Sequence, residues 1–173
     1  ISEGGLKLEG NGGYNMTGGT IAANKGKWYA EFTIKGEYIY LGIADPGHET
    51  INERVGHKAN AFGCLYYDNQ SSGYSLSLYN NDGNVSHSFP QVSTNLNDGF
   101  GTAMIAVDID AKKIWWGLNG TWFSTDNGVG NPATGANALI SSHANFTDGF
   151  WTWAGSPYHS DNEEVHANFG QRA

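Results

Sequence analysis

Apolar and polar residues alternate with a period of two along most of this chain, and each alternating segment ends in a cluster of glycine or asparagine. Residues 27–34 (KWYAEFTI) place Trp28, Ala30, Phe32 and Ile34 on one face. A period of two is the spacing of a half-buried β-strand, whereas an amphipathic helix repeats its apolar residues every three or four positions. The 25 glycines and 18 asparagines among the 173 residues supply turns between such strands. The chain is therefore predicted to be all-β.

The alternating segments predict the order of strands. Residues 28–43 are expected to form an antiparallel hairpin through Gly36-Glu37, and a second hairpin is expected to close at Asp110-Ala111. A short helical turn is expected only at residues 48–54. Ten or more short strands without a long helix favour a single domain, residues 1–173, built as an antiparallel β-sandwich. The further expected strands are residues 19–23, 61–67, 74–79, 85–88, 102–109, 112–119, 149–154 and 164–168.

Charge and hydropathy exclude several classes of partner. Nine Lys and Arg against 17 Asp and Glu give a net charge of −8. A protein of this sign repels phosphate backbones and anionic lipids, so neither nucleic acid nor a membrane surface is an expected partner. The longest apolar run has about five residues against the roughly 20 of a membrane span, which predicts a soluble protein. Because the chain begins with Ile1, we expect a mature product or a domain cut from a longer protein.

The aromatic residues divide into a predicted core and a surplus. Strand alternation turns Trp28, Phe32, Phe62, Trp116 and Phe169 inward, and Cys64 is expected to be a small buried hydrophobe. The surplus is too large to bury in one layer, so a second layer or an interface is expected to cover part of it. Aromatic rings in polar loops suit both sugar stacking and peptide capture. The surplus aromatics are Tyr38, Tyr40, Trp115, Trp122, Trp151 and Tyr158.

Candidate catalytic and metal-binding residues are few. Asp108 and Asp110 lie two apart on a strand, at about 6.5–7 Å, a separation compatible with the paired carboxylates of a glycosidase. No glutamate flanks the pair, and turn capping is the favoured interpretation. The six histidines lack a spacing that places two on one face. The acids near residues 45–53 lack the spacing of a calcium-binding loop, so no cofactor or metal is predicted.

Five motifs occur in order along the chain: residues 26–32 (GKWYAEF), 40–44 (YLGIA), 62–74 with the turn at 81–83 (NDG), 105–110 with 114–120 (IAVDID and IWWGLNG), and 168–170 (NFG). In this order they resemble the SPRY domain, a bent, jelly-roll-type β-sandwich of the concanavalin A-like class. Together they extend over residues 19–171, nearly the whole chain, after an N-terminal segment of residues 1–18. An Asn-Pro-Ala-Thr-Gly stretch at residues 131–135 further resembles a variant met in bacteriophage and environmental viral structural proteins.

The resemblance implies a protein-interaction module without catalytic residues. Peptide-binding members hold their ligand at one end of the sandwich, partly on the loop after a late strand, which here corresponds to Trp153 and Gly155. A glycine there is expected to let the chain turn sharply, and no residue matches the arginine that contacts ligand in the family. The candidate ligand-binding residues are Trp151, Trp153, Gly155, Tyr158, His57 and Tyr67.

The sequence thus predicts a non-enzymatic recognition module that binds a protein, a peptide or a cell-surface glycan through loops at one end of the sandwich. We expect it to be part of a larger phage or viral host-recognition protein, in a virion or outside the cell. Two alternatives stay open. One is a concanavalin-like glycan hydrolase that uses Asp108 and Asp110; the other is a capsid or tail decoration domain that self-associates through exposed aromatics.

Overall fold

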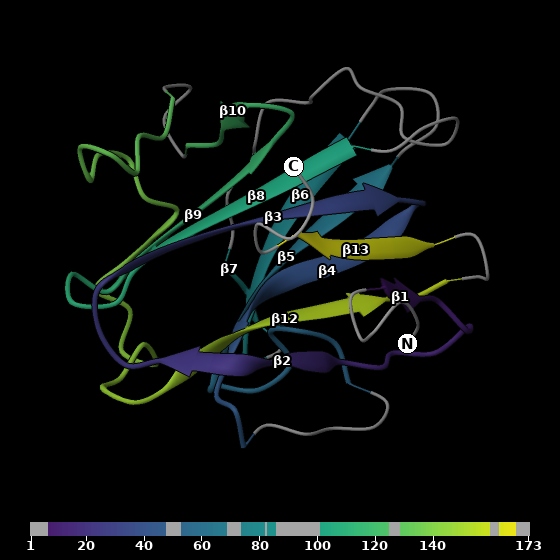
Figure 1. Ribbon diagram of the computed structural model, residues 1–173, viewed down its shortest axis with the longest axis horizontal. Coiled ribbons are helices and arrows are strands. Elements are labelled where there is room, and N and C mark those ends of the chain that lie inside the picture. The colour runs from purple at the N-terminus through teal and green to yellow at the C-terminus, as the bar shows by residue number, and fades with distance from the viewer. Residues whose placement is uncertain are drawn as a thin grey trace.

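Two antiparallel sheets packed face to face form the protein (Figure 1). The computed structural model describes residues 7–47, 53–68, 74–81, 83–85, 101–124, 129–159 and 163–168. Within these ranges the chain has 13 strands and no helix. The predicted all-β sandwich is confirmed.

The first sheet has the strand order β1-β13-β3-β8-β9-β10, with β11 beside β10 on the outer edge of β9. Its strands are β1 (Lys7–Glu9), β13 (Glu164–Asn168), β3 (Lys27–Lys35), β8 (Gly101–Asp108), β9 (Lys113–Leu118), β10 (Thr121–Trp122) and β11 (Ile140–Ser141).

The second sheet has the order β2-β12-β4-β5-β6-β7. Its strands are β2 (Thr17–Ala23), β12 (Trp151–Pro157), β4 (Tyr38–Ala44), β5 (Ala61–Asp68), β6 (Tyr74–Asn80) and β7 (Gly83–Val85).

The core lies between the sheets, where the alternating apolar faces meet. Phe32, Ile105 and Trp116 face it from the first sheet, and Leu41 and Phe62 face it from the second. The indole N–H of Trp116 donates to the carbonyl oxygen of Leu41 at 3.1 Å, so one fully buried side chain ties the two sheets together. The prediction that Phe32, Phe62, Cys64 and Trp116 are core residues is confirmed.

The predicted hairpin at residues 28–43 is wrong. β3 pairs with β8 and β13, whereas β4 pairs with β5 and β12, so the Gly36-Glu37 connection crosses from one sheet to the other. Gly36 has a φ of +117°, and a Cβ there would lie 2.5 Å from Cγ of Glu163. The crossing therefore needs glycine both for its backbone conformation and for its close approach to Glu163.

Each of the other expected strands overlaps a strand of the structure, whereas β1, β10 and β11 are not among the predictions. The hairpin of β8 and β9 closes as expected, with Asp108 opposite Lys113. The late strand begins at Trp151 and continues to Pro157, so the chain does not turn at Gly155. Residues 86–88 of one expected strand, residues 48–52 of the expected helical turn, and Phe169 lie outside the described residues, while Glu53 and Arg54 are not helical.

Candidate binding groove on the outer face of the first sheet

A row of three side chains crosses the outer face of the first sheet. Tyr29 on β3 lies opposite Ala106 on β8, which in turn lies opposite Trp115 on β9. Side chains at directly paired positions stand on the same face of a sheet. The small side chain of Ala106 between two aromatic ones therefore leaves a hollow at the middle of the row.

Aromatic and loop residues wall this hollow into a groove of about 360 Å³. Trp122 packs edge-on against Tyr29, with ring centroids 6.0 Å apart. Pro132 and Ala133 line the groove from the loop that follows β10. Trp28 and Tyr29 remain 46% and 52% exposed, which is high for large aromatic residues. The groove thus offers aromatic surface that the described part of the chain does not cover.

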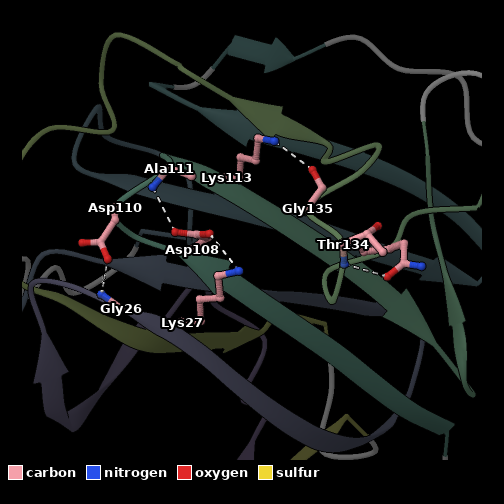
Figure 2. A network of polar contacts seen from close by, with 9 residues as sticks. Gly26, Lys27, Asp108, Asp110, Ala111, Lys113, Thr134 and Gly135 are labelled. Carbon is pink, nitrogen blue, oxygen red and sulfur yellow. Dashed lines mark hydrogen bonds and ion pairs between the residues drawn. The ribbon is translucent and has the colours of Figure 1, made fainter.

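The loop of residues 129–139 is fixed to the sheet by hydrogen bonds. The indole N–H of Trp115 donates to the carbonyl oxygen of Ala136 at 2.8 Å. Figure 2 shows a second contact, in which Nζ of Lys113 donates to the carbonyl oxygen of Gly135 at 2.8 Å. Within the loop, the N–H of Thr134 donates to Oδ1 of Asn131 at 3.1 Å. This loop is a second layer over Trp115, one of the two kinds of cover that the sequence predicted for the surplus aromatics, and it leaves Trp115 only 1% exposed. The groove is therefore largely formed without a ligand.

A charged row borders the groove at the end of β8. Lys27, Asp108 and Lys113 are paired across β3, β8 and β9, two residues along from the aromatic row. The carboxylate of Asp108 lies 3.6 Å from Nζ of Lys27 and accepts a hydrogen bond from the N–H of Ala111 at 2.9 Å (Figure 2). The side chain of Lys27 stays 67% exposed. Lys27 is thus the exposed positive charge at this end of the groove.

Asp110, the other member of the candidate carboxylate pair, accepts a hydrogen bond from the N–H of Gly26 at 3.1 Å (Figure 2). Asp108 and Asp110 therefore fix the β8–β9 turn and its contact with the start of β3. This is the turn-capping role that the sequence analysis favoured over catalysis.

A single carboxylate, that of Glu31, lies on the outer face just beyond the residues that line the opposite end of the groove. Glu31, Met104 and Gly117 form the next row of the outer face. The hydroxyl of Tyr29 lies 2.5 Å from Oε1 of Glu31. Partial burial and this carboxylate raise the pKa of Tyr29, so its hydroxyl stays protonated at neutral pH and donates to Glu31. An extended ligand in the groove would meet lysine at one end and glutamate at the other.

The prediction that Trp28 is a core residue is wrong. Alternation along β3 directs Trp28 inward, as expected. The residue lies at the start of β3, however, where it lines a small cavity of about 30 Å³ together with Ile43 and Trp151. Its indole N–H donates to the carbonyl oxygen of Lys25 at 2.8 Å. The ring therefore folds over the β2–β3 connection and forms the rim between the core and the groove.

Three of the predicted ligand-binding residues lie on β12. Trp151 is 6% exposed and packs on Phe62 and Phe146. Trp153 is half-buried and packs edge-on against Phe32, with ring centroids 6.3 Å apart. A Cβ on Gly155 would lie 3.1 Å from Cδ1 of Leu8 and 3.3 Å from Cδ2 of Leu41, so this glycine faces the space between the sheets.

Tyr67 and Tyr158, two more of the predicted residues, lie on the outer face of the second sheet, in a layer of tyrosines. Tyr158 stacks on Tyr14 at 3.9 Å between ring centroids, and Tyr67 lies 4.6 Å from Tyr38. The hydrogen bond with Tyr67 raises the pKa of Tyr38 to about 12. These five predicted residues are thus divided between the two faces of the second sheet.

His57, the last of the six, is joined to this layer through Arg54. Its N–H donates to the carbonyl oxygen of Arg54, and its Nε2 lies 3.6 Å from a carboxylate oxygen of Glu53. The guanidinium of Arg54 lies over the rings of Tyr40 and Tyr79, 5.6 and 4.8 Å from their centroids. Arg54 therefore fills the space between these rings.

Sequence reasoning missed Tyr29, Ala106 and Pro132 as groove residues. The alternation along each strand did give a signal: Tyr29 lies on the opposite face from the core residue Phe32, and Trp115 on the opposite face from the core residue Trp116. Which outward residues meet across the sheet depends on the pairing of β3 with β8, and alternation within one strand does not give that pairing.

Solved structures of SPRY domains share this fold. The SPRY domain of human HERC1 superimposes on the whole of this chain and 94% of its own, with a TM-score of 0.64 and 17% sequence identity. The PSpry domain of TRIM65 covers 88% of this chain and 68% of its own, with a TM-score of 0.56 and 12% identity. No protein-family model and no curated protein sequence matches the chain. The predicted SPRY fold is confirmed.

Neither a metal-binding cluster nor a membrane-spanning helix is found in the part of the chain that the structure describes. No cluster of three His, Cys, Asp or Glu side chains there could hold a metal ion. No helix there is long and apolar enough to cross a membrane.

Proposed function

We propose that this protein is a non-catalytic recognition module that binds an extended segment of a partner protein in the groove over Ala106, which Tyr29 and Trp122 help to line. The observation that carries the proposal is the row Tyr29–Ala106–Trp115, because it places a small residue between two large aromatic ones on an outer sheet face. SPRY domains, whose fold this chain shares, are interaction modules, and this agrees with such a role.

The composition of the groove favours a peptide. Aromatic side chains supply rigid contact area at low entropic cost and dominate binding energy at interfaces. Grooves lined by aromatic residues and proline also accept extended, proline-containing segments. Because the loop of residues 129–139 is fixed by Trp115 and Lys113, binding requires little ordering of the protein itself.

The charges at its two ends give the groove a direction. Lys27 and Glu31 are four residues apart on β3, which is about 13 Å along a strand. We infer that the preferred segment is extended, places an apolar side chain over Ala106, an acidic residue toward Lys27 and a basic residue toward Glu31. Complementary charges of this kind set orientation and partner choice more than affinity.

A second candidate surface is the tyrosine layer of the second sheet, because it contains Tyr67 and Tyr158 and extends through Arg54 to His57. It has the aromatic composition of a binding surface. Its rings, however, already stack on one another, as Tyr158 does on Tyr14. We therefore regard the tyrosine layer as the second candidate surface, and the variant Tyr158→Ala tests it.

The test is a peptide and glycan array on the purified wild-type protein, followed by titration of the strongest peptide. Trp28→Ala and Tyr29→Ala are each expected to weaken binding about 5- to 150-fold, which corresponds to about 1–3 kcal/mol for an interface anchor. Phe150→Ala is the matched control, because Phe150 is 57% exposed and does not line the groove.

Charge is tested by a second matched pair. Lys27→Glu is expected to weaken an acidic-to-basic peptide, whereas Lys25→Glu makes the same change in net charge at an exposed residue outside the groove and should have little effect. Binding that survives Tyr29→Ala but is lost in Tyr158→Ala would move the site to the tyrosine layer. Binding of glycans and of no peptide would overturn the choice of ligand.

A further inference from the structure

The free edge of β2 differs from the other sheet edges of the described chain. β2 has seven residues, Thr17–Ala23 (TGGTIAA), without a charge or a proline. The other edge strands β1, β7 and β10 have two or three residues each. Proteins usually protect a long edge strand with charged residues or proline, because unpaired main-chain groups invite another strand. β2 has neither of these protections.

At Thr20, the main-chain N–H and C=O groups of β2 point away from β12, toward the free edge of the sheet. The hydroxyl of Thr152 on β12 lies 2.8 Å from the carbonyl oxygens of both Gly19 and Ile21, so both carbonyls point toward β12. Because main-chain groups alternate in direction along a strand, those of Thr20 point to the free edge. The register between β2 and β12 shifts at this point, which leaves β2 with extra residues between Gly18 and Ala22.

The edge has a protruding side chain at one end and a hollow at the other. Ile21 is 69% exposed, the highest value among the exposed large hydrophobic residues of the described chain. Beside Gly18 and Gly19 lies an apolar hollow of about 60 Å³, lined also by Phe32 and Trp153. The two glycines have no side chain to fill it.

We propose that two copies of this chain pair antiparallel through β2, around a two-fold axis at Thr20. In this register Thr20 lies opposite Thr20 of the second copy, and Ile21 of each copy lies opposite Gly19 of the other, next to the apolar hollow. A two-fold interface has to be self-complementary in this way. Main-chain hydrogen bonds would join the second sheets of the two copies into one continuous sheet. No residue of β2 lines the aromatic groove, although Ile21 lines the same small cavity as the rim residue Trp28.

The size of the contact sets its strength. Seven residues extend about 23 Å, and a strand pair of this length buries on the order of 600 Å² in total. Stable interfaces bury about 1,200–2,000 Å². Each copy also carries a net charge of −8, so salt should favour the pair by screening the repulsion. We therefore expect a weak, concentration-dependent dimer that is strengthened by salt.

Sedimentation equilibrium tests the proposal. The average mass of the wild-type protein should rise from monomer toward dimer between about 1 µM and 1 mM. Ile21→Lys should remove this rise. Val129→Lys is the control, because Val129 is 65% exposed, lies outside β2, and gives the same change in charge. A wild-type protein that is monomeric throughout would overturn the proposal and show that the bulge of β2 between Gly18 and Ala22 is sufficient protection. A dimer lost in Val129→Lys but kept in Ile21→Lys would also overturn it.

Disulfide cross-linking tests the register. Opposed residues of a hydrogen-bonded antiparallel pair have Cα atoms about 5.5 Å apart, which a disulfide can bridge. Thr20→Cys should therefore form a covalent dimer in air, while the native Cys64 is buried and burial raises its pKa. Thr121→Cys is the control, because Thr121 is an exposed threonine on edge strand β10 of the other sheet. Equal cross-linking of both variants would contradict the pairing.

Discussion

Replacement of Trp116 and of Trp28 by alanine should have unequal effects on stability, although both residues are large, lie on strands of the same sheet and share an inward phase. Trp116 is fully buried, and its N–H donates to Leu41 across the core. A tryptophan buries up to about 250 Å², and at about 25 cal/mol per Å² this gives an upper limit of about 6 kcal/mol. Trp116→Ala should therefore lower the free energy of unfolding by about 3–5 kcal/mol, the usual cost of such a deletion.

Trp28 keeps 46% of its surface exposed, so its removal takes away about half as much buried area. Trp28→Ala should cost about 1.5–2.5 kcal/mol on the same scale. The assay is urea denaturation followed by circular dichroism, with the slope of the transition checked for constancy. Equal losses for the two variants would refute the assignment of Trp28 to the rim, and a larger loss for Trp28→Ala would reverse it.

Three further outcomes follow from particular contacts. Gly42→Ala should prevent folding, because the added Cβ would lie 1.8 Å from the carbonyl oxygen of Phe62. Gly149→Ala is the control and should be tolerated, because the space around its Cβ is open. Thermal melts of the two variants distinguish these outcomes. Burial raises the pKa of Glu163 above its ordinary 4.5, so the folded state binds the carboxyl proton of Glu163 more tightly than the unfolded state does. The free energy of unfolding should therefore fall as pH rises from about 4.5. Glu163→Gln should remove the part of this fall that comes from Glu163. The wild-type protein should release no reducing sugar from a polysaccharide panel, and activity that Asp110→Asn abolishes would restore the hydrolase alternative.

The fold could be predicted from the sequence because its strands carry their burial pattern locally. Trp115 and Trp116 are adjacent, and their opposite phases correctly place one on the outer face and one in the core. The same pattern gave a wrong hairpin at Gly36-Glu37, because alternation is identical whether the next strand pairs with the last one or crosses to the other sheet. It also misplaced Trp28, since the phase gives a side chain its direction but does not show where the two sheets stop covering each other.

The binding groove could not be predicted, because it depends on pairing between strands far apart in the sequence. Tyr29, Ala106 and Trp115 form one row only through the register of β3 with β8 and of β8 with β9. Three of the residues chosen from the sequence face the space between the sheets: Trp151, Trp153 and Gly155. Two others, Tyr67 and Tyr158, lie on the outer face of the same sheet. Their role in binding stays a prediction, as do the viral source and the binding of a glycan.

The central claim, that the outer groove is the recognition surface, is tested most directly by the indole N–H signals of the six tryptophans in a nitrogen-15 correlation spectrum. Titration with the strongest peptide from the array should shift the signals of Trp28, Trp115 and Trp122, which line the groove, and leave that of Trp116 in the core unchanged. Shifts confined to Trp151 and Trp153, with the groove signals unmoved, would contradict the claim.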